Sequence, residues 1–154
     1  MPDHHKPFAI ALGCIIVFMI IYVVAGSFGW GLQAPHEQAI GEISRWCERV
    51  SPGAFREPSN ALSNMGFMLA GLLMLRVLSK DSEYLLGLNQ FFGFTPISIL
   101  YASSVIWLGA GSMLMHGTHT RWGASADNLS MVMYILIPWL FNLSQMGGWS
   151  TRKL

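Results

Sequence analysis

The first apolar run of the chain, residues 8–30, contains no charged residue. In a helix that rises 1.5 Å per residue, about 20 apolar residues cross the hydrocarbon core of a bilayer, so this run is long enough to span. A signal peptide is the alternative, because Lys6 precedes the run and residues 25–27 are small. However, the run exceeds the roughly 7–15 apolar residues of a signal peptide. It therefore predicts a membrane-spanning helix.

Three later segments have the same apolar character, with Arg76 as their one charged residue. Only 11% of the residues in the chain are charged and 53% are hydrophobic, whereas about a quarter of a soluble domain is charged. The sequence thus predicts an all-α, polytopic membrane helix bundle, integral and multi-pass, with about four transmembrane helices. Shorter interfacial segments are expected at 41–49 and 85–94. The three later spans are expected at residues 60–78, 96–116 and 128–143.

Charge and cysteine content exclude several classes of function. The net charge is +1 and Lys and Arg are not clustered, which argues against a nucleic-acid partner. Cys14 lies in an apolar run and Cys47 in a polar segment, so no mutual disulfide is expected. No paired-cysteine zinc spacing exists. Positive residues are divided almost evenly between the two expected membrane faces, which leaves the orientation open.

Alternating spans would bring the polar residues of the chain to one membrane face. The end of the first and third spans and the start of the second and fourth share that face. Ionisable groups at membrane depth are costly and are candidates for function. We therefore expect the chemistry of the protein at this face. Its polar residues are Glu48, Glu57, Asn60, Asn64, Ser112, His116, His119 and Asp127.

Ser112 and His116 are four residues apart and so lie on the same side of a helix. Imidazole is a common zinc ligand, and a nearby hydroxyl can donate to a developing oxyanion. Asp127, near the opening of the next helix, could meet His116 and accept a proton from a metal-bound water. The pattern predicts metal-assisted hydrolysis of a lipid that enters sideways.

Each of these residues also has a purely structural interpretation. Asp127 is a candidate cap of the fourth helix, and Ser112 a small residue for close helix packing. Asn60 and Asn64 could hydrogen-bond between helices, and His119 could be a solvated loop residue. Two non-hydrolytic hypotheses remain open. One is a non-catalytic multi-span protein that binds a lipid or a protein partner, and the other is a scaffold or transporter subunit.

Two ordered pairs of segments resemble the signatures of the alkaline ceramidase family. This family belongs to a superfamily of seven-span membrane hydrolases that also contains adiponectin-receptor-like proteins. The resemblance covers roughly residues 45–143. It implies that residues 32–154 form part of a ceramidase-type seven-span bundle and that residues 1–31 add an extra N-terminal helix. The segments are residues 46–48 (WCE) with 57–64 (EPSNALSN), and residues 111–116 (GSMLMH) with 127–131 (DNLSM).

The resemblance implies a zinc-dependent hydrolysis of the ceramide amide, which gives a fatty acid and a sphingoid base. His116 would be one of three histidines that hold the zinc. Ser112 would hydrogen-bond the zinc site or the oxyanion, and Asp127 would transfer protons. Asn60 and Asn64 are assigned to binding of the ceramide-like lipid substrate.

A calcium site is also implied, because Trp46 (through its carbonyl), Glu48 and Glu57 match positions that hold calcium in eukaryotic relatives. Arg45 and Val50 depart from that pattern, since Asp and Asn are expected there. The other two zinc histidines of the family form a His-x-x-x-His pattern on its last span, and this chain has no such pattern. Three interpretations follow: the chain is the N-terminal part of such a protein, a second chain supplies the histidines, or the chain is an inactive relative.

Overall fold

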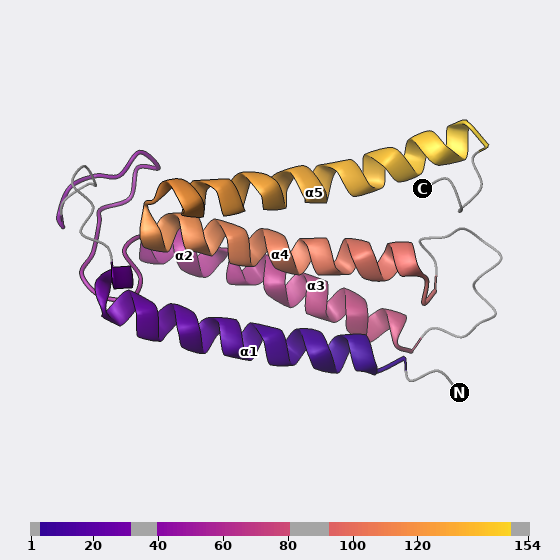
Figure 1. Ribbon diagram of the computed structural model, residues 1–154, viewed down its shortest axis with the longest axis horizontal. Helices are drawn as coiled ribbons and strands as arrows, with labels where there is room; N and C mark the ends of the chain where they lie inside the picture. Colours follow the sequence, from indigo (N-terminus) through magenta and orange to yellow (C-terminus); the bar gives the residue numbers. More distant parts are fainter. Residues whose placement is uncertain (1–3, 32–39, 81–92, 149–154) are drawn as a thin grey trace.

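The computed structural model describes residues 4–31, 40–80 and 93–148, which form a bundle of long helices (Figure 1). Every regular element in these ranges is a helix, apart from one isolated β-bridge between Ile43 and Arg49. The predicted all-α class is confirmed. The elements are α1 (Lys6–Ser27), η1 (Gly29–Gly31), α2 (Pro58–Ser63), α3 (Met65–Leu78), α4 (Pro96–Thr118) and α5 (Arg121–Met146).

Four helical segments of the described chain are long and apolar enough to cross a membrane. One of them joins α2 and α3 over Pro58–Leu78, and α1, α4 and α5 are the others. This number agrees with the prediction. The expected helix at 41–49 does not form, because the backbone folds back there and Cys47 has a left-handed φ of 62°. The expected interfacial segment at 85–94 lies almost wholly outside the described residues.

Helix starts follow local capping chemistry. Thr95 and Ser98 form a reciprocal capping box at the start of α4, and Pro96 occupies the first turn. The fourth span begins at Arg121, seven residues earlier than expected, because the Thr120 hydroxyl accepts a hydrogen bond from the Gly123 N–H. Asp127 is therefore inside α5, and its interpretation as a helix cap is wrong.

Helix α4 is the central element, with α3 on one side and α5 on the other (Figure 1). Glycines at both contacts let the helix backbones approach closely, as small residues do in membrane bundles. The three closest approaches are those of Gly71 to Ala102, Gly109 to Asn64 and Gly111 to Ala126.

Helix α1 packs against the α3–α4 core through residues spread along its length, from Phe8 through Ile15 to Tyr22. Near its start, Phe8 packs on the α3–α4 core, and the Arg76 guanidinium lies 5.5 Å from the centre of the Phe8 ring. Near its end, Tyr22 and Gly26 are the buried residues of the helix. Most of the apolar surface of α1 remains exposed.

Gly111→Ala should destabilise the bundle. A Cβ at Gly111 would lie 2.7 Å from the Ala126 carbonyl oxygen, so α4 and α5 must separate, at a cost of about 1–3 kcal/mol. Unfolding in mixed detergent micelles, followed by circular dichroism, measures the loss. Gly66→Ala is the matched control, because nothing lies within 4 Å of its Cβ position. Equal stability of the two variants would contradict the close α4–α5 contact.

Candidate functional site

The end of α1, α2, the end of α4 and the start of α5 lie together at one end of the bundle (Figure 1). Glu57, the residue before α2, is fully buried there. Its Oε2 atom is 2.7 Å from His116 Nδ1 and accepts a 2.8 Å hydrogen bond from the Asn60 amide. Its Oε1 atom is 2.7 Å from His119 Nε2. One buried carboxylate therefore joins two histidines and an asparagine.

The two histidine contacts differ in geometry. The Glu57–His116 pair has the distance and angles of a hydrogen bond. The Glu57–His119 pair is equally short but lacks hydrogen-bond angles, so it is an electrostatic contact that strengthens when the imidazole is protonated. Burial of an unpaired carboxylate is very costly, and these neighbours provide the compensation.

The end of α4 brings both histidines to the same carboxylate. His116 lies in the last turn of α4, and His119 follows the helix with a left-handed φ of 52°. The His119 N–H donates to the Met115 carbonyl, which closes the helix end. Left-handed backbone costs a non-glycine residue roughly 1–2 kcal/mol. The strained turn is what directs His119 back toward Glu57.

Trp46 covers the histidines from the segment that precedes α2. The centre of its ring lies 5.1 Å from that of His116 and 5.9 Å from that of His119. The indole is itself partly exposed, at 38%. It therefore forms the outer wall of the cluster between the imidazoles and the surroundings.

Glu48 fixes the start of α2 beside this cluster. Its two carboxylate oxygens accept hydrogen bonds of 2.6 Å from the Ser59 N–H and 2.8 Å from the Asn60 N–H. Burial by itself would raise the pKa of Glu48. The two backbone hydrogen bonds and the nearby His116 outweigh that effect and hold the pKa below its ordinary value.

Ser112 and Asp127 lie in the same half of the bundle but do not join the cluster. Ser112 is one helical turn before His116, and Gly111 beside it packs on Ala126. Within the described residues, no hydrogen bond or ion pair links His116 to Ser112 or Asp127. The structure thus pairs His116 with Glu57 instead of Asp127.

Of the other predicted site residues, Asn60 and His119 join the cluster and Asn64 does not. Asn60 contacts Glu57, whereas the Asn64 amide donates to the Asn60 carbonyl at 2.7 Å, within the α2–α3 segment. The interpretation of His119 as a solvated loop residue is wrong, since its side chain is only 5% exposed. The short separation of His116 and His119 in the sequence was the available signal, although the left-handed turn at His119, and not helical spacing, brings the second imidazole to Glu57.

The cluster suits the predicted zinc better than the predicted calcium. His116 directs Nδ1 to a carboxylate and keeps Nε2 as a second ring nitrogen, which is how second-shell carboxylates orient zinc-binding histidines. The oxygens predicted for calcium on Glu48 and Glu57 instead contact backbone N–H groups and histidines. Among the described residues, no group of three His, Cys, Asp or Glu side chains is arranged around a common metal position.

Comparison of the chain with family models, curated proteins and solved structures gave no match. The ceramidase resemblance and both metal assignments therefore remain predictions.

Glu57→Ala should lower the free energy of unfolding by about 3–5 kcal/mol, the usual cost of removing one partner of a buried pair. Unfolding in mixed micelles measures the loss. His5→Gln, at an exposed residue far from Glu57 in the sequence, is the control and should leave stability unchanged. A loss of under about 1 kcal/mol would show that Glu57 does not organise the cluster.

Glu48→Ala should cost about 1 kcal/mol at neutral pH, the typical effect of a lost helix cap. Because folding lowers the pKa of Glu48, its contribution is complete above the unfolded pKa of about 4.3 and disappears as pH falls through the folded value. Wild type and variant should thus converge in stability at acidic pH. Arg45→Ala, in the same loop, is the control. A difference that persists at acidic pH would contradict the assigned role.

Proposed function

We propose that this chain is an integral, multi-pass membrane protein whose Glu57–His116–His119 cluster belongs to a zinc-assisted amide hydrolase of membrane lipids. Its substrates would be ceramide-like and its products a fatty acid and a sphingoid base. The observation that carries the proposal is the fully buried Glu57 carboxylate held against His116 at the polar end of the bundle. Buried ionisable clusters of this kind in membrane proteins mark functional sites.

The contact with Glu57 would set the tautomer and the ring orientation that His116 needs as a zinc ligand. A proton on Nδ1 hydrogen-bonds to the carboxylate and leaves the lone pair on Nε2 for a metal. Zinc, when bound, supplies a Lewis acid for the amide carbonyl and a water of lowered pKa. His116 is the zinc ligand that the described residues offer. The proposal requires further ligands from residues outside the described ranges or from a second copy of the chain, both of which the full-length protein provides.

Ser112 and Asp127 are assigned the remaining steps in this proposal. The Ser112 hydroxyl, one turn from His116, donates to the oxyanion that forms at the amide carbonyl. Asp127 accepts a proton from the attacking water and returns it to the leaving amine. The partial burial of both side chains leaves them accessible to a bound substrate.

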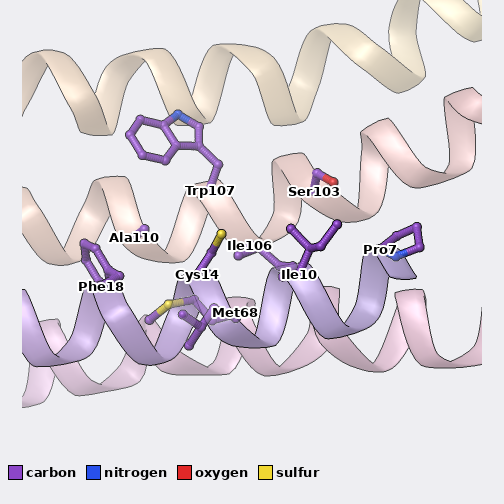
Figure 2. A pocket seen from close by; sticks show the side chains of 11 residues that line it. Pro7, Ile10, Cys14, Phe18, Met68, Ser103, Ile106, Trp107 and Ala110 are labelled. Atoms are coloured by element: carbon purple, nitrogen blue, oxygen red, sulfur yellow. The ribbon is translucent and has the colours of Figure 1, made fainter. Parts of the chain in front are cut away.

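A cavity between α1, α3 and α4 supports a lipid as the ligand (Figure 2). Its volume is about 540 Å³, and apolar side chains dominate its lining, among them Cys14, Phe18 and Trp107. Met68 and Ala110 line the cavity and also belong to the core cluster of Tyr22 and Met113, beneath the histidines. The same cavity favours the second candidate function, a non-catalytic lipid-binding protein.

Release of fatty acid from a fluorescent ceramide tests the proposal. The full chain in lipid nanodiscs, with zinc supplied, should hydrolyse the amide, and His116→Ala and Asp127→Ala should each lower the rate at least about 100-fold. Ser112→Ala should cost about 100-fold, as for a lost oxyanion donor. Ser125→Ala, exposed on α5, is the matched control for Ser112→Ala and should retain full activity.

Two outcomes would overturn the hydrolase proposal. Retained activity in all three site variants would show that hydrolysis does not use these residues. Ceramide binding by the zinc-supplied wild type without any hydrolysis would establish the lipid-binding alternative.

A further inference from the structure

Tyr22 is the point at which α1 enters the protein interior. It is fully buried, although most of the apolar surface of α1 is exposed. The interior cluster around it contains Met68, Ala110 and Met113. A helix that only anchored the chain would not need a buried tyrosine at this end.

One side of Tyr22 contacts the turn of α4 that carries the histidines. The Tyr22 hydroxyl donates a 3.1 Å hydrogen bond to the Met113 carbonyl, one turn before Gly117. Gly117 lies between His116 and His119 in the chain. A methyl group on Gly117 would collide with the Tyr22 hydroxyl, so the ring is seated directly against this backbone.

The other side of Tyr22 contacts the segment that leads to Glu57. The centres of the Tyr22 and Phe55 rings are 5.4 Å apart, and Phe55 is two residues before Glu57. One turn further along α1, a Cβ on Gly26 would lie 2.7 Å from the Ala54 carbonyl oxygen. The end of α1 thus touches both chain segments whose side chains meet in the Glu57–histidine cluster.

We infer that Tyr22 is a positioning residue for the Glu57–histidine cluster, and that α1 is therefore a working part of the site. The phenol ring fills the space between the Phe55 segment and the Gly117 turn and sets their separation. That separation determines whether one carboxylate can reach both imidazoles. The inference rests on this packing, and only its consequence for activity rests on the proposed function.

The imidazoles of His116 and His119 report directly on this role. In full-length protein with ¹³C/¹⁵N-labelled histidine, Tyr22→Leu should change the tautomer signals of both rings. It should also raise their rate of modification by diethyl pyrocarbonate about tenfold, because the cluster opens locally. Phe8→Leu is the matched control, an aromatic truncation at the other end of the same helix. It should leave both readouts as in the wild type.

A second variant tests the spacing from the opposite side. Gly117→Ala introduces the colliding methyl group and should disturb the histidine signals as Tyr22→Leu does. In the double variant, the smaller leucine should relieve the collision, so the effects should be strongly non-additive. If Tyr22→Leu does not fold, Tyr22→Phe keeps the ring and removes the bond to Met113. It should then raise the modification rate about twofold.

Unchanged histidine signals and modification rates in a folded Tyr22→Leu or Tyr22→Phe variant would overturn the inference, as would strict additivity in the double variant. These readouts need neither zinc nor substrate. A wild type without hydrolase activity would thus defeat the proposed function and leave the role of Tyr22 intact.

Discussion

The carboxylate of Glu57 is the group on which the polar end of this bundle depends. A buried carboxylate needs polar partners, and here they come from two distant parts of the chain, Asn60 beside it and the histidines at the end of α4. The end of α4 at Thr118 places both histidines within reach of this carboxylate. The left-handed turn at His119 and the cover provided by Trp46 follow from the same requirement.

The helical architecture could be predicted because it depends on the length and polarity of each segment. Apolar runs predicted four helices long enough to span a membrane, and four such helices are present in the described chain. Boundaries were less predictable where a single hydroxyl decides them. The Thr120 side chain caps α5 at Arg121, well before the apolar run begins. The start of this helix is polar, so hydropathy could not locate it.

The location of the Glu57–histidine cluster could be predicted from topology, but the pairing within it could not. Alternation of the spans predicted that Glu57 and His116 share one end of the bundle, and Figure 1 shows α2, which follows Glu57, beside the end of α4. Which carboxylate meets His116 depends on the rotation of α4 about its own axis, and close glycine contacts on two of its faces set that rotation. Spacing favoured Asp127, whereas the rotation presents His116 to Glu57. Tyr22 gave no signal because its apolar surroundings hid its one polar contact.

The cavity lies along helix α1 from Pro7 to Phe18 (Figure 2), and beyond it Tyr22 joins the helix to α4 through its hydrogen bond to Met113. In the bilayer proposed for this chain, a helix adapts to a change in hydrocarbon thickness by tilting. A tilt of α1 would displace Tyr22, whose ring abuts Gly117 in the turn between His116 and His119. In such a bilayer, the thickness of the surrounding lipid would act through Tyr22 on the positions of the two histidines.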